Sequence, residues 1–104
     1  MAVTRNFKDT IQARALRDPD FRYGLLKESI EHMLNGDTTT GKSLLRDYIN
    51  ATIGFEKLAD ITDKSPKSLM RMFSREGNPT ASNFFGILHT LQKREGLHLE
   101  IHRY

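Results

Sequence analysis

Four basic residues lie in a stretch of the sequence that contains no Asp or Glu, and they are Lys64, Lys67, Arg71 and Arg75. Three acidic residues, Glu56, Asp60 and Asp63, precede this stretch. Ammonium and guanidinium groups neutralise phosphates, and an arginine can donate two hydrogen bonds to O6 and N7 of a guanine. The chemistry indicated is therefore the binding of double-stranded DNA, provided that these residues share one exposed face of a helix.

A second motif, Gly36–Ser43, satisfies the G-x-x-x-x-G-K-S pattern of a phosphate-binding P-loop. A P-loop must follow a buried parallel strand, whereas the residues before Gly36 continue an amphipathic helix. No apolar strand ending in an Asp is available to hold magnesium. We therefore expect a turn between two helices here and keep a P-loop nucleotide binder as a remote alternative.

The other residues that could take part in catalysis form no recognisable active site, so no enzyme is predicted. There is no cysteine, and the carboxylates form no recognisable catalytic grouping with the four histidines. His98 and His102 lie four residues apart, but in a predicted strand, where one ion cannot bridge them without a partner strand. No metal ion or cofactor is predicted.

Length and composition favour a single domain spanning 1–104. The net charge of the 104 residues is only +3, so a nucleic-acid interface depends on where the charges lie. No secretory signal is visible, and no segment approaches the roughly 20 apolar residues that span a bilayer. We expect a cytoplasmic protein with no membrane partner.

Three helices are predicted within residues 1–54. The first covers residues 7–16, where apolar residues recur every four positions. Asp18 and Pro19 are typical of the start of the second, which Gly36 ends. Its predicted buried stripe is Phe21, Leu25, Leu26, Ile30, Met33 and Leu34. Hydroxyl groups of Thr38, Thr39 or Thr40 can cap the third, which Gly54 stops.

Residues 55–94 are predicted to hold a helix-turn-helix and a supporting helix. In the first short helix Leu58, Ala59 and Ile61 are expected to pack inward. Ser65 and Pro66 mark the start of the second, whose Leu69, Met72 and Phe73 form its buried side. The supporting helix begins at Thr80 or Ser82, buries Phe84, Phe85, Leu88 and Leu91, and ends at Gly96.

The predicted DNA contacts follow from this orientation. A period of 3.6 residues turns Lys67, Ser68 and Arg71 outward, at the end of the helix that typically enters the major groove. These are the candidate base contacts. Candidate phosphate contacts lie at the turn or after the helix: Lys64, Ser65, Arg75, Asn78 and Thr80. The alternative is an ordinary solvated helix face, which charge spacing alone does not exclude.

The C-terminal residues 97–102 alternate apolar and polar side chains, which is the pattern of a β-strand with one buried face. A strand needs a partner for its backbone groups, and no other strand is predicted. Pairing with the same segment of a second copy gives a homodimer. The alternatives are pairing with a different protein and a frayed tail.

The segments SPKSLMRMFS and GNPT resemble the helix-turn-helix antitoxins of the addiction-module antidote type, which are related to Cro/repressor regulators. The resemblance covers about Leu58 to Ile101. Matching positions are Ala59, Thr62, Ser65, Ser68, Leu69, Met72, Ser74, Gly77, Asn78, Pro79 and Thr80. It implies a DNA-binding domain that represses its own operon and a surface that neutralises a ribonuclease-like toxin. Residues 41–59 look more like a bacterial family described only as transcriptional regulators.

One departure from that pattern lies in the turn. Asp63 and Lys64 stand where the pattern has a glycine and an apolar residue. Asp adopts the left-handed backbone conformation more readily than most other residues, so a turn is still expected.

The prediction is therefore a mainly α protein, a helix-turn-helix bundle of about six helices with a short C-terminal β-strand paired across a dimer. We expect a sequence-specific transcriptional regulator, a bacterial repressor that binds an operator of two half-sites. The alternative function is an antitoxin that binds a toxin protein.

Overall fold

Polar side chains begin four helices of this chain. In a computed structural model, which describes residue 11 and residues 13–103, a side-chain oxygen at each of these starts accepts a hydrogen bond from the backbone N–H three residues later. The capping residues are Asp18, Asp37, Ser65 and Thr80. The predicted threonine cap of the third helix is wrong, because the Asp37 carboxylate takes that position and bonds Thr40 N–H at 3.1 Å.

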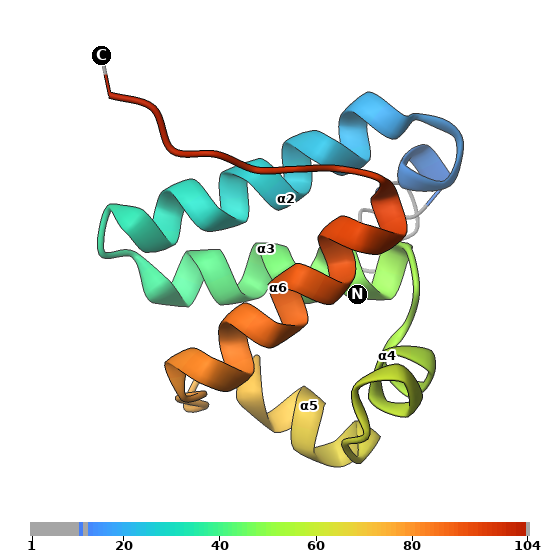
Figure 1. Ribbon diagram of the computed structural model, residues 1–104, viewed down its shortest axis with the longest axis vertical. Coiled ribbons are helices and arrows are strands. Elements are labelled where there is room, and N and C mark those ends of the chain that lie inside the picture. Colours follow the sequence, from blue (N-terminus) through green and yellow to red (C-terminus); the bar gives the residue numbers. More distant parts are fainter. Residues whose placement is uncertain (1–10, 12, 104) are drawn as a thin grey trace, which may run out of the picture.

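The described chain is mainly helical, as predicted. The helices with defined bounds are α2 (Pro19–Leu34), α3 (Thr38–Ala51), α4 (Phe55–Thr62), α5 (Pro66–Met72) and α6 (Ala81–Glu95). Residues 11 and 13–17 are also helical, while the start of the first predicted helix, residues 7–10, lies outside the described residues. α2 and α3 run antiparallel side by side, α6 crosses them, and α4 and α5 form the opposite end of the molecule (Figure 1).

Glycines fix the hairpin between α2 and α3. Gly36 has a φ of 88° and follows the end of α2, as predicted. Gly41 lies so close to α2 that an added Cβ would stand 2.8 Å from the carbonyl oxygen of Ser29, which is itself fully buried. The two helices therefore approach each other at a position where only glycine fits.

The core joins all five helices, but it uses helix faces somewhat different from those predicted. Its fully buried members include Leu26, Leu45, Tyr48, Ile49, Leu58, Leu69, Phe73, Ile87 and Leu91. Within the helices, three residues predicted to be buried are exposed: Leu34, Ile61 and Phe85. Each lies at the margin of its helix's apolar stripe, and in α6 the buried face is centred on Ile87 and Leu91 rather than on the Phe85 side.

The C-terminal tail, residues 97–103, forms no strand within the described chain. The alternation that predicted a strand is present only in part: Leu97 and Leu99 pack against the core, whereas Ile101, the third apolar residue, is exposed. The polar side chains that alternate with them lie close together, because the Glu100 carboxylate oxygens are 3.6 Å from His98 Nε2 and 3.2 Å from His102 Nε2. Leu99 N–H donates to the Gln92 side chain at 2.8 Å. A single copy thus lacks the second strand that a ladder requires.

None of the described helices combines the length and the apolar character needed to cross a membrane.

Candidate nucleic-acid interface

A tight turn connects α4 to α5. Asp63 has φ 57° and ψ 43°, the left-handed conformation, and it is the one non-glycine residue with positive φ in the described chain. The next N–H, that of Lys64, returns to the carbonyl oxygen of Ala59 at 2.9 Å and closes the helix end. The turn expected at this position is therefore formed by an aspartate in place of a glycine.

The inner side of α5 is anchored to two other helices. Leu69 and Phe73 are fully buried and Met72 is half-buried, as predicted. The Phe73 ring has its centroid 6.3 Å from that of Phe55 in α4 and 6.5 Å from that of Phe84 in α6. Aromatic pairs at such separations add to the burial free energy, so α5 is held firmly against the core.

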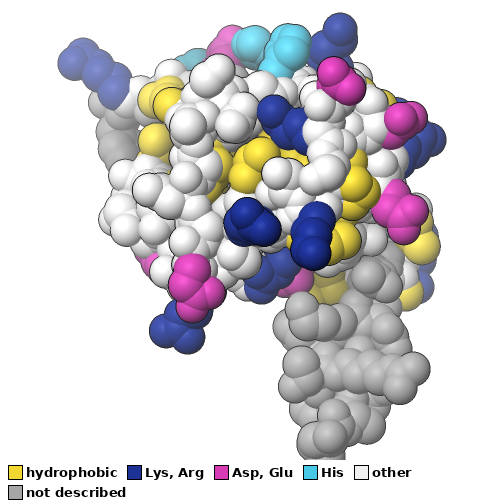
Figure 2. All heavy atoms as spheres, turned by 90° about the horizontal axis from the view of Figure 1, so that it is seen from below, with side chains coloured by type: hydrophobic (Ala, Val, Ile, Leu, Met, Phe, Trp, Pro, Cys, Tyr) yellow, Lys and Arg dark blue, Asp and Glu magenta, His cyan; other side chains and the backbone are white. Residues whose placement is uncertain are grey.

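Five of the eight predicted contact residues lie on the outer side of α5 or in the segment after it. Their side chains are all exposed, and they are Lys67, Ser68, Arg71, Arg75 and Asn78. None of these side chains makes a hydrogen bond or ion pair within the described part of the chain. Figure 2 views this end of the molecule and shows Lys and Arg side chains in its middle, around a small apolar patch, with acidic side chains towards the periphery. The exposed groups are available to an external ligand.

The other three predicted residues already have structural partners. The Lys64 ammonium group donates to the Asn83 side chain at 3.1 Å and so links the turn to α6. The hydroxyl oxygens of Ser65 and Thr80 accept the capping bonds of α5 and α6. Ser65 and Thr80 are nevertheless exposed, and sequence position alone did not separate residues with a structural partner from residues without one.

A surface hollow of about 450 Å³ brings several predicted residues together. Ser68 and Arg71 line it from α5, and Asn78 and Thr80 line it from the loop before α6. Lys67 is not among its lining residues. Glu76 and Asn83 also line it, so the hollow offers hydrogen-bond donors and acceptors beside one guanidinium group.

Two cations of α3 were not predicted to belong to this region. Lys42 Nζ donates to the carbonyl oxygens of Arg75 and Gly77, at 3.1 Å and 2.5 Å. Arg46 Nη1 donates to the carbonyl oxygen of Phe73 at 2.9 Å. A spacing of four residues places Lys42 and Arg46 on one face of a helix. Their acceptors are backbone carbonyls 27 to 35 residues away, and no sequence pattern predicts such contacts.

The same contacts account for the P-loop-like segment. Gly36 lies in the turn between α2 and α3, Ser43 lies within α3, and the segment before the motif is α2 rather than a strand. Lys42, the residue that would contact phosphates in a P-loop, is directed at carbonyl oxygens and is 9% exposed. Gly41 serves the packing of α3 on α2. Lys42 and Gly41 thus have structural roles that differ from those of the same motif positions in a P-loop, which bind phosphate.

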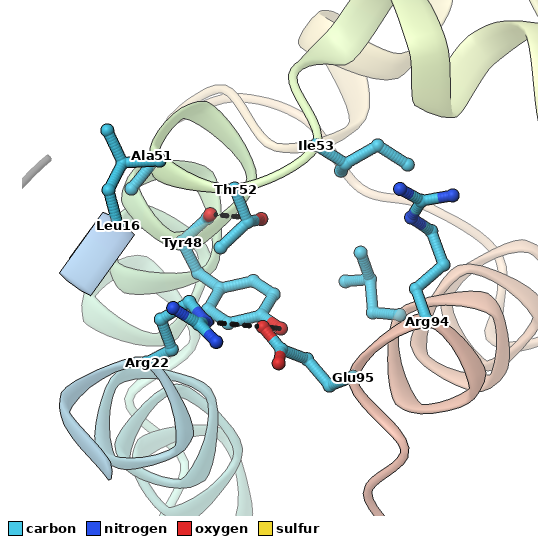
Figure 3. Close-up of a pocket in the computed structure, with 9 residues that line it drawn as sticks. Leu16, Arg22, Tyr48, Ala51, Thr52, Ile53, Arg94 and Glu95 are labelled. Atoms are coloured by element: carbon cyan, nitrogen blue, oxygen red, sulfur yellow. Dashed lines mark hydrogen bonds and ion pairs between the residues drawn. The ribbon is translucent and has the colours of Figure 1, made fainter. Parts of the chain in front are cut away.

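A second cavity, of about 230 Å³, lies between α2, α3 and α6 (Figure 3). Glu95 accepts hydrogen bonds from Arg22 and from the Tyr48 hydroxyl, each at 2.9 Å. Burial, together with the hydrogen bond to Glu95, raises the pKa of Tyr48 well above its ordinary value. Arg22, Tyr48 and Glu95 thus form a hydrogen-bonded structural network in this cavity, whereas the side chain of Arg94, which also lines it, makes no hydrogen bond within the described chain.

Among the described residues no three His, Asp or Glu side chains are grouped so that they could hold a metal ion. Comparison of the chain with protein-family models, curated proteins and solved structures gave no match. The α4–α5 unit is the feature on which a function can be proposed.

Proposed function

We propose that this protein is a sequence-specific DNA-binding transcriptional regulator of the helix-turn-helix class, a repressor that binds an operator of two half-sites. The observation that carries the proposal is the arrangement of α4 and α5. A left-handed turn joins two short helices, and the second is anchored by Leu69 and Phe73 while its outer face presents unpartnered cations. In this class the outer face of the second helix enters the major groove.

The exposed residues divide into two roles. Lys67, Ser68 and Arg71 lie on α5 itself, and Arg71 is the residue able to bind a guanine through two hydrogen bonds. Arg75 and Asn78 lie beyond the helix, where contacts to phosphate set the register. Lys64, Ser65 and Thr80 stabilise the turn and the start of α6, and their contacts with phosphate stay a prediction.

The proposal includes a homodimer formed through the C-terminal tail. Leu99 N–H bonds the chain's own α6, whereas the N–H groups of His98, Glu100 and His102 donate no hydrogen bond in the described chain. An antiparallel pair centred on Leu99 would place His98 opposite Glu100 of the second copy and Leu97 opposite Ile101, which is 82% exposed in one copy. Two copies would then read half-sites about 34 Å apart.

Cysteine cross-linking tests this pairing, because the chain has no native cysteine. In a pair centred on Leu99, the two copies of a Leu99→Cys variant lie within the Cα separation of about 4.4–6.8 Å that a disulfide spans. Copies of Ile101→Cys lie about 14 Å apart along the ribbon and provide the control. Cross-linking at 101 but not at 99, or a strictly monomeric protein, would rule out this register.

Selection from a random duplex library tests the DNA proposal. The wild-type protein should enrich one sequence containing two related half-sites, at physiological salt, where nonspecific contacts are weak. A Lys67→Ala/Arg71→Ala variant should enrich none, although its fold is retained. If the wild-type protein enriched no sequence, the proposal would fail.

A groove between α2, α6 and the tail supports the antitoxin alternative. It has a volume of about 400 Å³ and is lined by three exposed apolar side chains, Leu34, Phe85 and Ile101. Exposed apolar groups gathered in this way are typical of protein-binding surfaces. Co-expression with a small basic protein encoded beside this gene would yield a complex that Phe85→Asp weakens. Separate elution of the two proteins would count against a toxin partner.

A further inference from the structure

Two basic side chains of α3, which are not among the proposed DNA contacts, hold the end of α5. Lys42 and Arg46 lie one turn apart on α3, and together they donate three hydrogen bonds to the carbonyl oxygens of Phe73, Arg75 and Gly77. These carbonyls belong to the residue that caps α5 and to the loop that leaves it. α3 is thus joined to α5 through charged donors.

Physical chemistry favours cations at this place. The last carbonyl groups of a helix have no intrahelical donor, and the partial negative charge at a helix C-terminus attracts positive groups. The loop is also sterically fixed. A Cβ added to Gly77 would lie 2.7 Å from the carbonyl oxygen of Met72 and closer still to that of Arg71. The exit from α5 therefore has one tightly packed path, with Lys42 bound to its backbone.

We propose that Lys42 and Arg46 are positioning residues, which set the orientation of the DNA-contacting face of α5 without contacting DNA themselves. This inference rests on the proposed function. The Arg75 carbonyl is held by Lys42 while the Arg75 side chain is exposed, and Gly77 is followed directly by Asn78. Movement of this backbone would displace two proposed phosphate contacts and the end of the helix that carries Arg71.

A Lys42→Met variant separates positioning from direct contact. The probes are the duplex that the wild-type protein selects and a scrambled duplex of the same length. Lys42→Met should lose about tenfold in affinity for the selected duplex and keep its affinity for the scrambled one, so the specificity ratio falls. A residue that binds phosphate would instead weaken both and reduce the slope of log K against log salt by about one.

A control must remove the same charge elsewhere. Lys93→Met does so at an exposed position in the last turn of α6. Its specificity ratio should stay within about twofold of the wild-type ratio, since single surface substitutions have small effects. A fall equal to that of Lys42→Met would assign the effect to net charge and overturn the inference.

Arg46 provides a second variant in case Lys42→Met does not fold. Arg46→Met should lower the specificity ratio, and Arg46→Lys should restore it, because one ammonium group can replace the single bond to the Phe73 carbonyl. The backbone amide resonances of residues 73–78 should move in Arg46→Met and return in Arg46→Lys.

The outcomes separate the two proposals. Folded variants of Lys42 and Arg46 that kept the wild-type specificity ratio would overturn the inference and leave the proposed function standing. A wild-type protein that does not distinguish the selected duplex from the scrambled one would overturn the proposed function itself.

Discussion

Two groups of cations at the same end of this molecule have opposite environments. Lys67, Arg71 and Arg75 project from α5 and the segment after it, and their side chains have no partner in the described chain. Lys42 and Arg46 project from α3 and are directed at backbone carbonyls. The five side chains carry the same charge. A basic side chain is therefore available to an external ligand only where the fold leaves its donors unused.

The contacts on the inner side of α5 also explain how so short a helix keeps a fixed position on the protein surface. The α5 helix has seven residues, too few to be stable alone in water. It is capped at its start by Ser65, buried through Leu69, and held at its end by Lys42 and Arg46. Burial and capping supply the rigidity, while the outer face contributes little to stability.

The largest effect is expected from Gly77→Ala, because the new Cβ would collide with backbone atoms of Arg71 and Met72. We expect it to destabilise the folded state by about 2–3 kcal/mol. Gly86→Ala is the matched control, since Gly86 lies in α6 with no atom near the added Cβ, and it should stabilise by about 0.5–1 kcal/mol. Urea denaturation measures both, and equal midpoints would contradict the tight exit.

Lys42→Met should cost about 1–3 kcal/mol of unfolding free energy, because two carbonyl oxygens lose their donor. The same change at Lys67 removes an exposed group with no partner and should stay within about 0.5 kcal/mol. Guanidinium denaturation of the two variants therefore compares the inward and outward cations directly. Similar losses would mean that the distinction between them is wrong.

Ser65→Ala removes the cap of α5 and should cost about 1 kcal/mol. Ser82→Ala is a suitable control, because the capping bond of α6 is made by Thr80 instead. Thermal unfolding followed by circular dichroism distinguishes the two. A larger loss for Ser82→Ala would show that the start of α6 has been assigned to the wrong residue.

The smallest effect is expected at Asp37, which caps the start of α3, the helix that carries Lys42 and Arg46. Hydrogen bonds from the Thr40 side chain and backbone N–H lower the pKa of this exposed carboxyl. A lowered folded-state pKa contributes stability above the unfolded value of about 3.9, and that stability is lost as the pH falls through the folded value. Asp37→Asn should therefore shift the melting temperature less between pH 7 and pH 3 than the wild type does. An unchanged acid dependence would exclude this contribution.

Local signals in the sequence predicted several of the helix ends. The Asp18 and Ser65 caps, each followed by proline, and the glycines after α2 and α6 predicted helix ends that the structure contains. Periodicity identified the buried side of α5. It did not find the exposed position of Phe85, because the edge of an apolar stripe is decided by which neighbouring helix is present.

The candidate interface was predictable only in part. Outward positions such as Lys67 and Arg71 follow from the helical period once Leu69 is placed inward. The partners of Lys64 and Lys42 depend on chain segments brought together by folding, so spacing could not separate a free cation from a bound one. The predicted strand is absent from the described chain, because a strand also requires a second chain or segment, and residue types do not name it.

The proposed role of α5 is tested most directly by the ratio of dissociation constants for a scrambled and a selected duplex, measured at physiological salt for the wild type and for Arg71→Ala. We expect a ratio of about 10³ or more for the wild type, typical of specific binding, and a fall of about 10–100-fold for Arg71→Ala with unchanged thermal stability. A wild-type ratio near one, or a ratio that Arg71→Ala leaves unaltered, would contradict the claim that α5 reads DNA.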